Sequence, residues 1–256
     1  MRAKRFRAKG RVLRAALAVA GCVWLAGCSV SDREASVGMP AVTEPVPAAL
    51  SQGAAAEHEI SGVPVLAQAP ELPTGCEATS LTMLLNYEGI AADKTDVVRK
   101  LPVVDVPVYL GDDSEMTGGD PNLGFVGDPF SADGYGVYHA PIAKVLNSYL
   151  PGRALDLSGK SFDDVLAAVA EDHPVVTWMA MDLDDVSTAY VWKTPDGQQI
   201  DWKVPEHCVL LTGYDESNVT VHDPYSGQTV RYDKQRFRQV WEALGSQAVT
   251  VQSKSA

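Results

Sequence analysis

The sequence predicts an α+β fold in which an N-terminal helical half packs on a C-terminal antiparallel sheet. Three observations indicate it. Before Pro174, apolar residues recur mainly at helical spacing. After Pro174, short apolar or alternating runs are typical of strands, and turn-forming residues separate several of these runs at hairpin spacing. Helices first and an antiparallel sheet later indicate the α+β class.

Five segments carry helical signals. Apolar residues lie three and four positions apart, and capping residues or a proline suited to a first helical turn mark several of the starts. A glycine after the first segment is a natural stop. The expected helices are 75–88, 95–101, 141–149, 161–169 and 233–244.

Six later runs carry strand signals, and two pairs of them should form hairpins. The turns of these hairpins are Pro195-Asp196-Gly197 and the polar run 215–218. The expected strands are 175–179, 189–193, 199–204, 207–214, 219–222 and 248–251. Residues 102–138 are dense in Gly, Asp and Pro, so we expect a long loop there that could cover a cleft.

The N-terminus reads as an export signal. Residues 1–27 contain seven basic side chains, no acidic one, and an apolar run too short to span a bilayer comfortably. The run ends in Leu25-Ala26-Gly27-Cys28, which resembles the lipobox of bacterial lipoproteins. That resemblance implies cleavage before Cys28 and lipidation of its side chain, and hence a membrane anchor facing the extracytoplasmic side. An ordinary signal peptide with an incidental Cys28 is the alternative.

After the signal, residues 28–60 are rich in Ala, Pro and Ser and predict a flexible tether, and residues 61–256 are long enough for one domain. Removing the signal takes away seven positive charges and no negative ones, which lowers the formal charge from −12 to −19. Such an acidic surface argues against nucleic acid as a partner, and it suits solubility outside the cell.

Cys76 lies in the first turn of the helix expected to begin at about Gly75. Thr74 and Glu77 have the Thr-x-x-Glu spacing of a capping box, so we expect Glu77 to cap the helix and not to act as a catalytic acid. Unpaired N–H groups and the helix dipole stabilise a thiolate at this position, and the thiolate is the nucleophilic form of cysteine. The sequence therefore predicts a reactive Cys76 with a lowered pKa.

The partners that a cysteine nucleophile needs come from elsewhere in the chain. His207 begins one strand of the second predicted hairpin, and Asp223 follows the other strand. Pairing of the two strands should therefore place Asp223 opposite His207 to within a few residues. His207 would share a proton with Cys76, and Asp223 would orient the imidazole. Gln68 has a side-chain NH₂ that can stabilise an oxyanion together with the backbone N–H of Cys76.

Motifs spread over the chain after residue 60 share one resemblance. They are Val63-Pro64-Val65 with Gln68, the runs 73–81, 127–129 and 134–138, Pro174-Val175-Val176 with Trp178, and the runs 207–215 and 223–227. Together they resemble a C39-like cysteine peptidase domain of papain-like fold. The resemblance implies four roles at matching positions: Cys76 as nucleophile, His207 as base, Asp223 as orienting acid and Gln68 as oxyanion donor.

This resemblance leaves the substrate open. Classical members of the wider group are fused to ABC transporters and cut leader peptides after paired glycines, whereas this sequence contains no transporter. The first hypothesis is a lipid-anchored thiol hydrolase acting on a peptide or amide bond of a peptide or protein substrate. The second is acyl transfer of the transglutaminase or amidase type on the same triad. The third is a non-catalytic surface binding module on a degenerate peptidase fold.

Each site residue also has a purely structural interpretation. Cys76 could be a buried thiol, His207 a satisfied core histidine and Asp223 a turn former. Because Cys208 follows His207 on a strand, their side chains should face opposite sides, which argues against a Cys76–Cys208 disulfide without excluding it. The histidines lack metal-ligand spacing, so we expect no metal and no cofactor.

Overall fold

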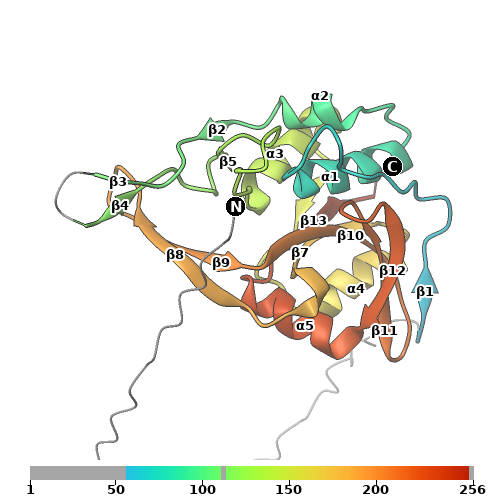
Figure 1. The fold of residues 1–256 in the computed structure, drawn as a ribbon. Coiled ribbons are helices and arrows are strands. Elements are labelled where there is room, and N and C mark those ends of the chain that lie inside the picture. The colour runs from blue at the N-terminus through green and yellow to red at the C-terminus, as the bar shows by residue number, and fades with distance from the viewer. Residues whose placement is uncertain (1–55, 111–113, 254–256) are drawn as a thin grey trace, which may run out of the picture. The chain divides into compact units, whose positions relative to one another are not determined.

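The computed structural model describes residues 56–110 and 114–253, which belong to one unit spanning Ser51–Ala256 (Figure 1). The helices are α1 (Cys76–Tyr87), α2 (Lys94–Val98), α3 (His139–Tyr149), α4 (Phe162–Ala170), α5 (Lys234–Ala243) and a 3-10 turn at Met181–Leu183. The strands are β1 (His58–Glu59), β2 (Val103–Val104), β3 (Val108–Tyr109), β4 (Met116–Thr117), β5 (Phe125–Val126), β6 (Ala154–Asp156), β7 (Val175–Ala180), β8 (Ser187–Lys193), β9 (Gln199–Val204), β10 (Glu206–Tyr214), β11 (Asn218–Asp223), β12 (Gln228–Asp233) and β13 (Ala248–Val251).

A seven-stranded sheet forms the centre of the described part. Its strand order is β12-β11-β10-β7-β13-β6, β1 also pairs with β10, and every pairing is antiparallel. Strand β10 is therefore the junction of the sheet: its first half pairs with β7 and its end with β1 and β11. All six residues of β7 are buried, as expected for a strand covered on both faces.

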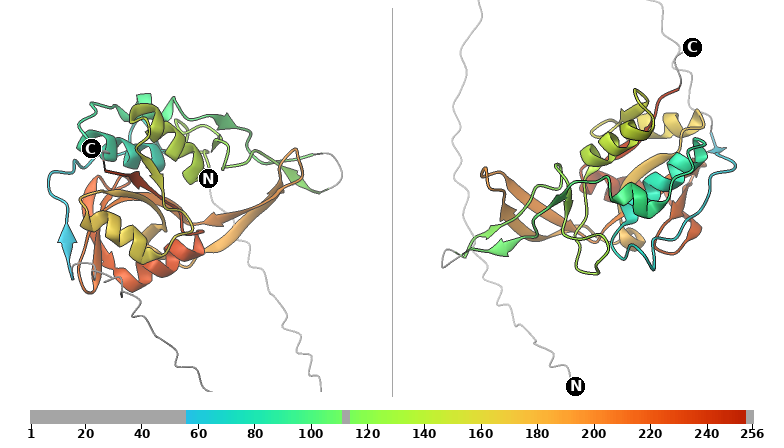
Figure 2. Two further views of the ribbon diagram at one scale, coloured as in Figure 1. Left: turned by 180° about the vertical axis from the view of Figure 1, so that it is seen from behind. Right: turned by 90° about the horizontal axis from the view of Figure 1, so that it is seen from above.

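Helices cover the two faces of this sheet. In the views of Figures 1 and 2, α1, α2 and α3 lie on one side of it and α4 and α5 on the other. The residue contacts agree, because α1 packs on β10 and β7, α3 on β13 and β6, and α5 on β7 and β11. The α+β class with an antiparallel sheet is confirmed. Within the described residues, none of the helices combines the length and the apolarity that crossing a bilayer would require.

A second, four-stranded sheet of order β3-β4-β8-β9 projects from the first as an arm (Figure 1). Trp192, Ile200 and Trp202 of this sheet form a separate apolar cluster with Val126 of β5. The segment 102–138 thus contains the short strands β2 to β5, where the sequence predicted only a loop. An apolar groove of about 760 Å³ runs along this segment, with Val103, Val106, Val108 and Leu123 among its lining residues.

Most predicted elements agree with the structure to within a few residues. Ser161 and Asp164 form the expected capping box of α4, and both predicted hairpins form, as β8–β9 and β10–β11. Strands β6 and β12 were not predicted. The signal peptide 1–27, Cys28 and the tether up to residue 55 lie outside the described residues, while His58 and Glu59 at the tether's end form β1.

Candidate active site

The N-terminus of α1 carries Cys76, but the predicted capping box is wrong. Gly75 occupies the N-cap position with no side-chain cap, and the Thr74 hydroxyl instead donates to the carbonyl oxygen of Ser131 at 2.9 Å. The backbone N–H of Cys76 donates to no acceptor in the described residues. It therefore stays available to an incoming ligand at the positive end of the helix dipole. The Cys76 side chain is 8% exposed.

Glu77 points into the interior instead of capping its helix. It is fully buried, its Oε1 accepts the backbone N–H of Val137 at 2.7 Å, and its Oε2 accepts the Cys76 thiol at 3.4 Å. The carbonyl of the same Val137 accepts the indole N–H of Trp178 at 3.0 Å. Gly136 permits this close approach, because a Cβ there would lie 2.7 Å from Glu77 Oε1. The Glu77 carboxylate, which local spacing predicts as a helix cap, therefore binds a backbone N–H sixty residues away instead.

A second carboxyl group, from Glu206 at the start of β10, joins this cluster. One ligand atom from each of Cys76, Glu77 and Glu206 lies within 4.8 Å of the other two, and Glu206 Oε1 is buried without a hydrogen-bond partner in the described residues. Burial raises the pKa of Glu77 to about 7 and the pKa of Glu206 well above its usual range, the latter helped by the charge of Glu77. Two buried carboxyls this close retain a shared proton near neutral pH.

The thiol of Cys76 responds to these surroundings. Burial first, then the charges of Glu77 and Glu206, raise the pKa of Cys76 well above its usual range, and a hydrogen bond from the backbone of Cys208 only partly offsets them. The expected lowering of this pKa is therefore wrong for the arrangement seen here, in which the thiol donates its hydrogen bond to Glu77. Cys76 and Cys208 are both free thiols.

His207 and Asp223 meet as the hairpin predicted. His207 Nε2 lies 2.7 Å from Asp223 Oδ1, and both side chains are buried. Asp223 also accepts the backbone N–H groups of Tyr225 and Ser226, so it forms the turn after β11 as well as binding the imidazole. Although burial opposes it, the bonds from His207 and Ser226 lower the pKa of Asp223 to about 2. Nδ1 of His207 makes no hydrogen bond in the described residues.

Gln68 lies between the two parts of the site. Its backbone N–H donates to the carbonyl of Pro224, next to Asp223, at 2.7 Å. Its side-chain Nε2 donates to the carbonyl of Pro73, at the approach to α1, at 2.8 Å. Its Oε1 is buried without a hydrogen-bond partner in the described residues. One of the two amide hydrogens is thus used within the protein, and the other is free for a ligand.

The structure therefore brings the predicted residues to two adjoining elements. His207 at the start of β10 pairs with Asp223, and Gln68 binds the residue after Asp223. The Cys76 sulfur lies within 4.8 Å of a carboxyl oxygen of Glu206, the first residue of β10. A direct hydrogen bond between Cys76 and His207 is not among the contacts of the described residues. Sequence reasoning missed Glu206 and the burial of Glu77. Their positions in the sequence could have indicated both, since Glu77 directly follows Cys76 and Glu206 directly precedes His207.

Comparison with known proteins supports this interpretation of the fold. Residues 60–249 match the model of the family described as Peptidase_C39 like. The chain belongs to this C39-like peptidase family. It is 38% identical over 184 residues to YvpB of Bacillus subtilis strain 168, an uncharacterised protein, which covers 72% of this chain and 71% of YvpB.

A crystal structure of a Bacillus anthracis protein assigned as a C39-like peptidase also superposes on this chain. The TM-score is 0.69 at 36% sequence identity, and the match covers 78% of this chain and 99% of that one. Membership of the C39-like family supports a peptidase, and the papain-like fold agrees with the α+β arrangement described above.

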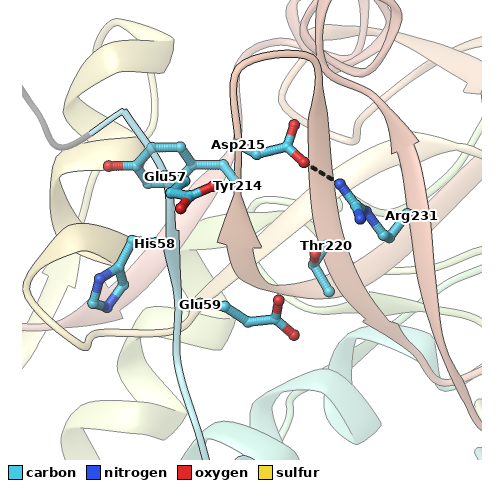
Figure 3. Close-up of a pocket in the computed structure, with 7 residues that line it drawn as sticks. All are labelled: Glu57, His58, Glu59, Tyr214, Asp215, Thr220 and Arg231. Carbon is cyan, nitrogen blue, oxygen red and sulfur yellow. Dashed lines mark hydrogen bonds and ion pairs between the residues drawn. The ribbon is translucent and has the colours of Figure 1, made fainter.

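Two other features of this C39-like domain bear on ligands. Within the described residues, Cys76, Glu77 and Glu206 form the one group of three side chains spaced closely enough to hold a metal ion. Separately, a polar hollow of about 440 Å³ lies beside the pairing of β1 with β10 and is also lined by Thr220 of β11 and Arg231 of β12. Figure 3 shows its lining, which includes the Asp215–Arg231 ion pair and none of the predicted site residues.

Proposed function

We propose that this chain is a cysteine peptidase that hydrolyses a peptide or amide bond with Cys76 as nucleophile, His207 as base, Asp223 as orienting acid and Gln68 as oxyanion donor. One observation carries the proposal: His207, which pairs with Asp223 in the buried interior, directly follows Glu206 on β10, and a carboxyl oxygen of Glu206 lies within 4.8 Å of the Cys76 sulfur at the N-terminus of α1. Family membership supports the same chemistry.

The proposed reaction has two steps. The Cys76 proton passes to Nδ1 of His207, which is the free ring nitrogen because Nε2 binds Asp223. The thiolate then attacks the carbonyl carbon, and the oxyanion is stabilised by the backbone N–H of Cys76 and the free amide hydrogen of Gln68. The imidazolium returns its proton to the leaving amine, and water hydrolyses the thioester. Before the first step, the thiol must exchange its hydrogen bond to Glu77 for one to His207.

The decisive experiment combines a peptide library with matched cysteine variants. The protein is incubated with a mixed peptide library, and new termini are identified by mass spectrometry. We expect cleavage by the wild type and by Cys208→Ala, and none by Cys76→Ala with an unchanged circular dichroism spectrum. Persistent cleavage by Cys76→Ala would rule the proposal out. Adding a primary amine to the reaction separates the alternatives, because a transferase would yield amine-linked peptides.

We also propose that the protein is anchored by lipid on Cys28, facing the extracytoplasmic side. The support is the N-terminal sequence alone. In the native host, Cys28→Ala should abolish metabolic labelling with a palmitate analogue and release the protein from the membrane fraction. Retention of the label in that variant would contradict the proposal.

A further inference from the structure

The segment that carries Gln68 has no regular structure of its own. Residues 61–75 contain turns but neither helix nor strand. The segment's buried Val63 and Leu72 fix it to the core, and elsewhere its geometry depends on what its backbone groups bind. Its bonds to Pro224 and Pro73 join it to both parts of the candidate site, so a shift of a few tenths of an ångström here would move the Gln68 amide.

Lys94, the first residue of α2, binds this segment from the side. Its Nζ donates to the carbonyl oxygens of Ala67 at 2.6 Å and Gln68 at 2.9 Å, and it forms an ion pair with Glu71 at 2.7 Å. A fourth acceptor, the carbonyl oxygen of Ala69, lies farther away at 3.5 Å, so the three closer acceptors match the three donors of an ammonium group. The Lys94 side chain is only 14% exposed, and hydrogen bonds from a charged group are stronger than those between neutral groups.

We propose that Lys94 is a positioning residue for acyl transfer, which holds the backbone of Gln68 so that its amide stays at the N-terminal end of α1. This inference rests on the proposed function, because it assigns Gln68 to the oxyanion. Lys94 contacts neither Cys76 nor Glu77, which accepts the hydrogen bond of the Cys76 thiol. It acts through the carbonyl that it shares with Leu72, whose N–H also donates to Gln68 O, at 3.0 Å.

The proposal distinguishes two reactions of the same sulfur. Acylation by an ester passes through a tetrahedral oxyanion and needs its donors correctly placed, whereas alkylation by iodoacetamide forms no oxyanion. A residue that positions Gln68 should therefore affect acylation and leave alkylation unchanged. A residue that only stabilises the fold should affect both rates together or neither.

The test measures both rates at Cys76. Acylation is followed as the p-nitrophenol burst from p-nitrophenyl acetate, with the Cys76→Ala rate subtracted, and alkylation by mass spectrometry after iodoacetamide treatment. We expect Lys94→Met to slow acylation roughly 10- to 100-fold, the scale of a misplaced catalytic group, and to leave alkylation unchanged. Lys94→Arg, which retains donors, should recover most of the rate.

Two further variants show where Lys94 acts. The control is Lys100→Met. The Lys100 ammonium lies 4.9 Å from the centre of the Tyr149 ring and not on the Gln68 segment, so this variant should leave both rates unchanged. Gln68→Ala should slow acylation roughly 10²- to 10³-fold, as for other oxyanion donors. Adding Lys94→Met to Gln68→Ala should cause no further loss, because one residue acts through the other.

Each outcome decides a specific point. Unchanged acylation in folded Lys94→Met, an equal loss of both rates, or the same loss with and without Gln68 would overturn the role of Lys94 and leave the proposed function standing. A wild type no faster than Cys76→Ala would end both. If thermal unfolding shows that Lys94→Met does not fold, Glu71→Gln takes its place. It removes the partner that orients Lys94, and the absence of a selective effect on acylation would overturn the proposal.

Discussion

Glu77 and Glu206 place carboxyl oxygens within 4.8 Å of each other and of the Cys76 sulfur. Two buried acids beside a nucleophile disfavour a second negative charge there, and so they favour the thiol over the thiolate. The pair therefore opposes the effect of the helix N-terminus, which favours the thiolate. The reactivity of Cys76 should depend on the balance between them.

Removing the charge of Glu77 should make Cys76 more reactive. Glu77→Gln keeps the shape of the side chain and removes the anion that accepts the thiol hydrogen bond. We expect the pKa of Cys76 to fall, and a fall of one unit gives roughly tenfold more thiolate at a given pH below that pKa. The measurement is the iodoacetamide rate at Cys76 between pH 6 and 9. Glu216→Gln, on an exposed turn, is the control, and a slower Glu77→Gln would contradict this account.

The same pair should make stability depend on pH. The native pKa of Glu77 is raised to about 7 from an ordinary 4.5, so between these values the folded protein binds more protons than the unfolded chain. The free energy of unfolding should therefore be highest below this window and fall as pH rises through it, by roughly 3 kcal/mol. Urea unfolding at pH 5 to 8 measures the slope, which should be flatter in Glu77→Gln. A stability that rises with pH over this window would count against the shared proton.

Asp223 should affect the reaction more than the fold at neutral pH. Asp223→Asn retains a hydrogen-bonding side chain but removes the charge that favours the imidazolium of His207. Peptide cleavage should fall roughly 10²-fold or more, which is the scale of acid–base assistance. The unfolding temperature of the variant is the control for the fold. Full activity in this variant would leave Asp223 with only its role in the turn after β11.

Gly134 should be intolerant of any side chain. A Cβ at this position would lie 2.7 Å from the carbonyl oxygen of Asp128 and would also press on the Thr74 hydroxyl, so Gly134→Ala must displace the approach to α1. We expect a loss of about 1–3 kcal/mol in the free energy of unfolding, as for an overpacked site. Gly152→Ala is the comparison: its Cβ would meet nothing within 4 Å, although its φ of +75° adds a strain of its own. A smaller loss for Gly134→Ala than for Gly152→Ala would contradict the steric argument.

The features that the sequence predicted correctly depend on local rules. Ser161 and Asp164 cap α4 because both partners lie within one turn, and His207 meets Asp223 because a short hairpin limits the possible registers. Local rules failed where a distant group competed. Glu77 binds the N–H of Val137, in a segment without periodicity that no spacing argument places beside α1. Glu206 was missed for the same reason, since only the packed fold brings it to Glu77.

Both backbone groups of Val137 are hydrogen-bonded: its N–H donates to Glu77, and its carbonyl accepts the indole N–H of Trp178. The three residues are buried. Moving the segment 134–138 away from Cys76 would leave each of these groups without a partner, at about 1–3 kcal/mol apiece. This side of the nucleophile therefore cannot swing open as a flap. A substrate must therefore reach Cys76 from another direction, without displacing this segment.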